Sequence, residues 1–76
     1  MSDESRLLSN VAANIRRERL RRALNQEDFA RIVGLHRTYV GEIERGEQNL
    51  TLRSVERIAE RLGVEAVSLL APLPID

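Results

Sequence analysis

The chain has 76 residues and no cysteine, and its 12 basic residues balance its 12 acidic ones. This length predicts one domain spanning residues 1–76, with a core from about 7 to 70 between short flexible termini, and it leaves no room for a separate catalytic lobe. With 42% hydrophobic and 32% charged residues, the composition excludes a disordered tail, disulfides and a membrane span, and the acidic start at residues 1–4 is unlike a signal peptide, so we expect a cytoplasmic protein.

Apolar residues recur at the helical period along most of the chain, which predicts an all-α fold without strands. The expected helices span residues 7–23, 26–33, 37–45, 52–62 and 65–70. The residues expected to face the core are Leu8, Val11, Ala12, Ile15, Phe29, Ala30, Val33, Val40, Ile43, Val55, Ile58, Ala59 and Leu62.

The boundaries of the second and third helices are marked by residues that cap or end helices. Asn25 and Thr51 are suited to N-cap the second and fourth helices, and Gly34 is suited to end the second. Only Leu35 and His36 then lie before the third helix, so the two helices must meet at a steep angle. This spacing is typical of a helix-turn-helix.

In a helix-turn-helix, the second helix lies in the major groove of DNA and presents its N-terminal residues to base edges. The outer face of the third helix is expected to carry Arg37, Thr38, Gly41, Glu42 and Arg45. Arg37 is the first candidate for base recognition, because arginine makes a bidentate contact with guanine that contributes about 1–3 kcal/mol of discrimination. The candidates for base contact are Arg37, Thr38, Tyr39, Glu42 and His36.

Several of these positions have a second interpretation. Gly41 either lets the helix approach the duplex or allows close packing against the first helix. Glu42 either accepts from cytosine, rejects wrong sites by repulsion, or pairs with Arg45. Tyr39 is equally suited to half-burial against the second helix, and His36 to a turn position near the helix start.

Phosphate contacts are expected on both sides of the third helix. The free N–H groups at the start of the second helix point toward an anion, with Gln26 beside them. The candidates for phosphate contact are Gln26, Arg17, Arg45, Asn49 and Thr51. Five of the 12 arginines fall within residues 16–22, where Arg21 and Arg22 add a diffuse positive field, although such a run is also typical of a solvated helix face.

Glu44 is turned inward by the same pattern, beside Ile43, and a buried carboxylate needs a cation. Arg19, which lies near the apolar face of the first helix, is the expected partner. We therefore interpret Arg19 and Glu44 as a structural ion pair and not as DNA contacts.

Taken together, the motifs resemble the XRE group of lambda-repressor-like DNA-binding domains over residues 10–70, and within it the controller proteins of restriction-modification systems. The motifs are residues 15–19, 24–30, 34–40, 43–46, 49–52 and 58–64. The resemblance implies a five-helix bundle that dimerises, binds its own promoter and times endonuclease expression. It also implies a backbone contact for Gln26, base readout by Arg37, and the Arg19–Glu44 pair. The sequence departs from the family at Asn25, where Ser or Thr is usual, at Ala23, where Gly is usual, and at Glu42, where a small residue is usual.

A homodimer is expected because one small module buries too little surface for tight specific binding, whereas two read palindromic half-sites. The expected interface residues are Val64, Val67, Leu70, Leu73 and Ile75. The alternative is that Val67 and Leu70 only cover the core of the monomer.

The leading hypothesis is a homodimeric, sequence-specific transcription regulator that binds a double-stranded DNA operator. An antitoxin or phage-type repressor would use the same mechanism, and a helical protein-interaction module without DNA binding is the alternative from another class. With no cysteine and one histidine, no nucleophile-base pair or metal cluster assembles, so we expect no enzyme activity, metal, cofactor or small-molecule ligand.

Overall fold

The computed structural model describes residues 5–73, and within this range it contains five α-helices and no strand. The helices are α1 (Arg6–Arg21), α2 (Gln26–Val33), α3 (Arg37–Glu44), α4 (Leu52–Leu62) and α5 (Ala66–Leu70). The acidic start at residues 1–4 and the interface candidate Ile75 lie outside the described residues. The all-α architecture predicted from the sequence is confirmed for the part of the chain that is described.

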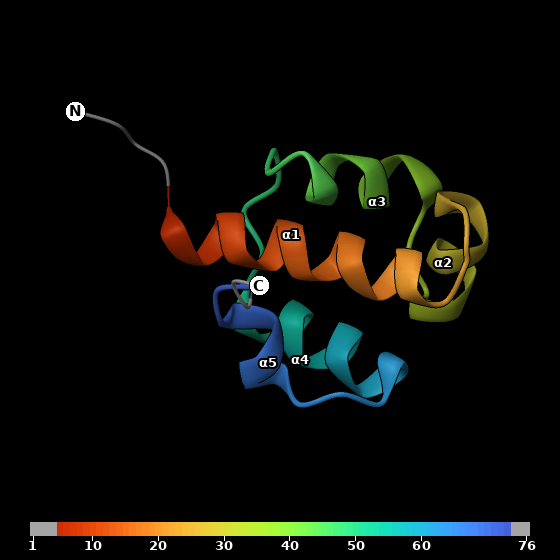
Figure 1. The fold of residues 1–76 in the computed structure, drawn as a ribbon. Coiled ribbons are helices and arrows are strands. Elements are labelled where there is room, and N and C mark those ends of the chain that lie inside the picture. The colour runs from red at the N-terminus through yellow and green to blue at the C-terminus, as the bar shows by residue number, and fades with distance from the viewer. Residues whose placement is uncertain (1–4, 74–76) are drawn as a thin grey trace.

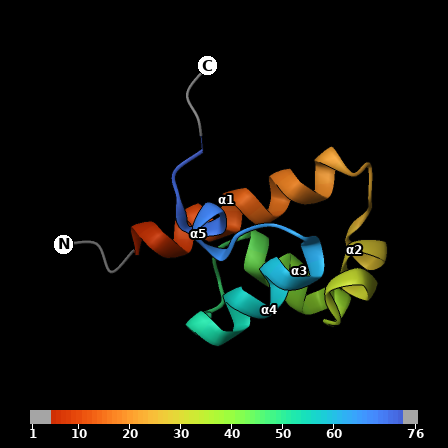
Figure 2. The same ribbon diagram turned by 90° about the horizontal axis from the view of Figure 1, so that it is seen from below.

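The longest helix, α1, organises the bundle. Figure 1 shows α1 crossing the molecule with α3 on one side, α4 and α5 on the other, and α2 beyond its C-terminal end. In the perpendicular view of Figure 2, α5 overlaps α1, which it contacts, and α3 and α4 both appear below α1. Helix α2 packs against α3 and α4, so the helix-turn-helix pair is fixed to the rest of the bundle through both of its members.

All five helices contribute to one hydrophobic core, in which Phe29 is the largest fully buried side chain. The buried cluster contains Val11, Ile15, Phe29, Ala30, Val33, Val40, Ile43, Val55, Ile58, Ala59, Leu62 and Leu69. Most of these were expected from the helical pattern. Two differ: Leu8 is only half-buried, and α5 buries Leu69, which the sequence analysis did not single out.

The predicted caps are confirmed. The Asp28 amide donates to Asn25 Oδ1 at 2.7 Å, and the Ser54 amide donates to Thr51 Oγ1 at 3.0 Å. Gly34 ends α2 in the left-handed conformation, with φ 74°, which glycine adopts without steric penalty.

The end of α1 was placed two residues too late by the sequence pattern, because α1 ends at Arg21. The amide of Ala23 donates to the Leu20 carbonyl at 3.0 Å, and the amide of Leu24 donates to the Arg19 carbonyl at 3.2 Å. This pattern ends a helix through a left-handed residue, a position usually held by glycine. Here Ala23 holds it with φ 55°, so the turn carries local backbone strain.

Two buried or half-buried asparagines of α1 fasten the C-terminal end of α5. The Asn14 side-chain amide donates to the carbonyls of Leu69 at 3.0 Å and Ala71 at 2.6 Å. One turn earlier, the Asn10 amide donates to the Leu70 carbonyl at 2.9 Å. These bonds satisfy carbonyls that the end of a helix leaves without intrahelical partners.

Candidate functional site

The turn between α2 and α3 is short and well hydrogen-bonded. After Gly34, the Leu35 amide donates back to the Ala30 carbonyl at 2.9 Å. His36 then serves as the N-cap of α3, because its Nδ1 accepts from the Thr38 amide at 3.1 Å. The expected turn role of His36 is therefore observed, and its ring lies at the surface where α3 begins.

The first two side chains of α3 lie at the surface. Arg37 and Thr38 are both exposed, and within residues 5–73 no carboxylate forms an ion pair with Arg37. Tyr39 is half-buried and packs against the core, as its structural interpretation expected. The exposed N-terminal end of α3 therefore offers one unpaired guanidinium and one hydroxyl side by side.

Glu42 is half-buried and engaged with a neighbour. Gln48 Nε2 donates to Glu42 Oε1 at 2.8 Å. The alternative in which Glu42 pairs with Arg45 is not observed, because the Arg45 Nε forms an ion pair with Glu47 Oε2 at 3.1 Å. The Glu47 carboxylate raises the pKa of Arg45, mainly through this hydrogen bond, and Glu42 adds a smaller electrostatic contribution.

Gly41 was expected on the outer face of α3, but it is buried. The ends of two long side chains lie closest to the position of its missing Cβ atom. A Cβ atom at Gly41 would meet Arg45 Nη1 at 3.2 Å and Gln26 Oε1 at 3.4 Å. The helical pattern indicates only which way Gly41 faces on its own helix. It does not account for the side chains of Gln26, from α2, and Arg45, from the next turn of α3, which cover that face.

Arg19 and Glu44 form the expected ion pair. Arg19 Nε donates to Glu44 Oε2 at 2.7 Å, and Arg19 Nη2 donates to Glu44 Oε1 at 3.0 Å. Arg19 Nη1 also donates to the Leu24 carbonyl at 3.0 Å. The hydrogen bonds with Glu44 raise the pKa of the Arg19 guanidinium, outweighing the opposing effect of burial. One arginine thus joins α1, the turn before α2, and the end of α3.

Gln26, the candidate phosphate ligand on α2, is part of the same network. Its Nε2 donates to Glu44 Oε1 at 3.2 Å, which leaves the amide half-buried above Gly41. Its side chain is therefore held in place by Glu44 at the first position of α2, where the Asn25 cap takes up the Asp28 amide.

The other phosphate candidates differ in how free they are. Arg17 and Asn49 are exposed. The Thr51 hydroxyl is committed to the α4 cap, since it accepts from the Ser54 amide and donates to Ser54 Oγ at 2.9 Å. Arg17, Arg45 and Asn49 are thus the candidates with exposed polar groups.

Arg22 was expected to contribute only a diffuse field, and this expectation is wrong. Its Nη2 donates to the Leu62 carbonyl at 2.8 Å, and its Nη1 pairs with the Glu18 carboxylate. The sequence analysis missed Glu18, which is buried on α1. The signal was the spacing of four residues between Glu18 and Arg22, which brings the two side chains together on a helix.

The predicted interface residues divide into two kinds. Val67 and Leu73 are exposed, at 74% and 37% of their surface, whereas Val64 and Leu70 are half-buried against the core. The alternative that Val67 and Leu70 only cover the monomer core is therefore wrong for Val67 but agrees with the position of Leu70, which packs against the core beside the buried Leu69.

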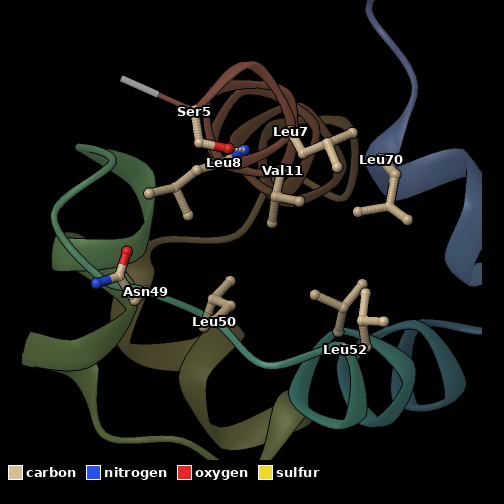
Figure 3. A pocket seen from close by; sticks show the side chains of 9 residues that line it. Ser5, Leu7, Leu8, Val11, Asn49, Leu50, Leu52 and Leu70 are labelled. Carbon is tan, nitrogen blue, oxygen red and sulfur yellow. Dashed lines mark hydrogen bonds between the residues drawn. The ribbon is translucent and has the colours of Figure 1, made fainter. Parts of the chain in front are cut away.

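Next to Leu70 there is an apolar cavity of about 210 Å³ between the start of α1, the loop before α4, and the end of α5. Figure 3 shows Leu8 and Val11 of α1 facing Leu50 and Leu52 across this cavity, with Leu70 at its side. Leu52 is 71% exposed, and the sequence analysis did not select it as a surface residue of interest. The signal was its place outside the apolar stripe of α4, where a leucine has no core position to fill.

Two classes of site find no support in the described range. Within residues 5–73 there is no group of three or more His, Cys, Asp or Glu side chains placed to hold a metal ion. None of the helices described there has the length and apolar character needed to span a bilayer.

Comparison with known proteins gives a consistent result. A family model described as helix-turn-helix (HTH_3) matches residues 15–69. The control protein C.SmaI of Serratia marcescens is 43% identical over 60 residues, which cover 79% of this chain and 71% of that protein. A crystal structure of the hypothetical transcription factor NHTF from Neisseria is 38% identical, with a TM-score of 0.81 over 95% of this chain and 85% of that one.

A third relative has been solved with DNA. The controller protein C.Esp1396I, as a tetramer in complex with its natural 35 base-pair operator, is 44% identical, with a TM-score of 0.76 over 87% of each chain. Solved variants of that protein replace an arginine, a threonine and a tyrosine at three consecutive positions. The same three residue types follow one another here at the start of α3, as Arg37, Thr38 and Tyr39.

Proposed function

This chain belongs to the helix-turn-helix family HTH_3, and on that premise we propose that it binds double-stranded DNA in a sequence-specific way and regulates transcription. The observation that carries the proposal is the pair of exposed side chains at the N-terminal end of α3, Arg37 and Thr38, which have no ion-pair partner among residues 5–73. Arg37 would read guanine through its O6 and N7 atoms, and Thr38 would contact a base edge or a thymine methyl group. Tyr39, His36 and Glu42 border this contact.

The phosphate backbone would be held on both sides of α3. Arg17, Arg45 and Asn49 have exposed polar groups, and the first amides of α2 lie beside Gln26. Such contacts fix the orientation of the protein on the duplex without reading the sequence. The zero net charge of the chain does not oppose this role, because what matters for association is the distribution of charge over the contacting surface.

The functional unit would be a homodimer that reads a palindromic operator. The exposed Val67 and Leu73 are apolar groups in excess of what the monomer core uses, and Leu52 is a further exposed apolar side chain that lines the cavity beside Leu70. A symmetric contact through α5 would place two copies of α3 in successive major grooves.

The narrower proposal is a controller protein of a restriction-modification system, acting in the cytoplasm. It is supported by the likeness to C.SmaI over 79% of this chain and to the operator-bound C.Esp1396I. An antitoxin or phage-type repressor would use the same DNA-binding surface, so genomic neighbours separate these roles and the DNA-binding experiment does not.

The test is selection of bound fragments from random duplex DNA, followed by a salt titration of the selected duplex. A DNA-binding dimer should enrich one palindromic sequence and lose affinity steeply as salt rises, because each neutralised phosphate releases counterions. Failure to shift any duplex at low ionic strength would reject DNA binding and favour a protein-interaction module.

A further inference from the structure

Gly41 lies within α3 at a position where the backbone conformation does not require glycine. Its φ lies outside the positive range adopted by Gly34, Gly46 and Gly63, and glycine in a helix is less stable than alanine. The missing side chain leaves a shallow space, and the ends of the Arg45 and Gln26 side chains occupy it. The glycine therefore determines where these two polar groups lie.

The Arg45 guanidinium lies back along α3, over Gly41, and it is not free. Its Nε lies 3.1 Å from Glu47 Oε2, in a contact that raises the pKa of Arg45. Both side chains are more than half exposed, at 58% and 55%, so a ligand can reach the guanidinium directly. The neighbouring Gln26 amide is held by Glu44, which keeps the polar groups above Gly41 together.

We propose that Gly41 and Glu47 set the strength of the phosphate contact made by Arg45. Gly41 leaves the space in which the guanidinium lies beside Gln26, and the Glu47 carboxylate occupies that guanidinium until a DNA phosphate displaces it. This inference rests on the proposed DNA binding, and it assigns an affinity-limiting role to an acidic residue that makes no contact with DNA itself.

Three carboxylates surround this region, and Glu47 is the one in direct contact with the Arg45 guanidinium. Glu44 is bound by both sides of the Arg19 fork, and Glu42 accepts from Gln48. Glu47 has Arg45 as its ion-pair partner and is exposed. A carboxylate and a phosphate oxygen are equivalent acceptors for a guanidinium N–H. Binding would thus exchange an internal ion pair for an intermolecular one, and the net gain from Arg45 is smaller than the contact itself.

The first experiment measures the dissociation constant of the full chain for a duplex selected with the wild-type protein. Glu47→Gln should lower the dissociation constant by a factor of about 2 to 5 for each subunit that contacts the duplex. This factor corresponds to the free energy of one exposed ion pair. The same substitution in an Arg45→Ala background should change the affinity little. Glu60→Gln, which removes an exposed carboxylate from α4, is the control for the general effect of net charge and should have little effect in either background.

The second experiment tests Gly41. Gly41→Ala should remain folded, because alanine favours the helix and the nearest atoms belong to flexible side-chain ends. Its methyl group should shift the Arg45 guanidinium by a few tenths of an ångström and weaken binding modestly, without weakening it further when Arg45 is already alanine. A loss of equal size in both backgrounds would mean that the methyl group blocks the duplex itself, and would overturn the role given to Gly41.

The possible outcomes distinguish failure of the competition between Glu47 and phosphate from failure of the proposed DNA binding. If the wild-type protein binds its duplex and Glu47→Gln leaves the affinity unchanged, or changes it equally with and without Arg45, the competition does not exist. If the wild-type protein binds no duplex, the proposed function fails first.

Discussion

Arg19 of α1 holds both carboxylate oxygens of Glu44 at the end of α3, with contacts of 2.7 and 3.0 Å. Glu44 in turn accepts from Gln26 at the start of α2, at 3.2 Å. The angle between the two members of the helix-turn-helix is thus fixed by one arginine from outside it. The position of the proposed DNA contacts depends on this interior network as well as on the apolar core.

The first prediction concerns that network. Because the Glu44 and Arg19 side chains are only 5% and 13% exposed, Glu44→Ala leaves a guanidinium without its partner in a nearly buried position. The free energy of unfolding should fall by about 3 kcal/mol, measured by urea denaturation. The control is Arg31→Ala, which breaks an ion pair to Asp28 that is exposed on both sides and should lower stability by less than about 1 kcal/mol. Similar values for the two variants would contradict the structural role of the pair.

The second prediction concerns base recognition. Arg37→Ala should weaken binding to the selected duplex by about 1 to 3 kcal/mol, which is the contribution of one bidentate contact with guanine. Binding to random duplex DNA should change little, because the contact is made only with the correct base. Fluorescence titrations of the two duplexes at the same salt concentration make the comparison. Equal losses on both would mean that Arg37 contacts phosphate instead.

The third prediction concerns the strained turn after α1. Ala23 adopts φ 55°, a conformation that glycine reaches without the steric penalty of a Cβ atom. Ala23→Gly should therefore raise the melting temperature and stabilise the fold by about 1 kcal/mol. Ala13→Gly, in the middle of α1, is the matched control and should destabilise by about the same amount. A loss of stability in both variants would show that the turn carries no strain.

The fourth prediction concerns assembly. Val67→Asp places a charge on a side chain that is 74% exposed in the single chain, so the monomer fold should remain intact while the dimer dissociates. Sedimentation velocity should report monomers, and circular dichroism should be unchanged. Ile32→Asp changes another exposed apolar residue, on α2, and should leave the dimer in place. If Val67→Asp still sediments as a dimer, the interface lies elsewhere, and the apolar mouth around Leu52 becomes the next surface to test.

Local signals were sufficient to predict the helix-turn-helix. Asn25 caps α2 and Gly34 ends it, and only two residues lie between Gly34 and α3, so a steep turn between the two helices could be predicted from the spacing. The expected partner of Glu44 was also found, because a carboxylate on an apolar face needs a nearby cation.

The wrong predictions concern features that the helical pattern of a sequence does not contain. Gly41 and Arg22 were both expected to face solvent because of where each lies around its own helix. Their actual surroundings depend on long side chains that reach from one element to another. The early end of α1 at Arg21 depends on Ala23 adopting a conformation that alanine seldom takes, and no propensity indicates it. Pairings such as Arg45 with Glu47 are decided by rotamers, which a sequence pattern does not contain.

Helix α5 has five residues, too few to persist as a helix in water without support. Asn10 and Asn14 supply part of that support by binding its last carbonyls. If subunits pair through α5, as proposed above, a second subunit would be recruited only after α1 has folded and holds α5 in place.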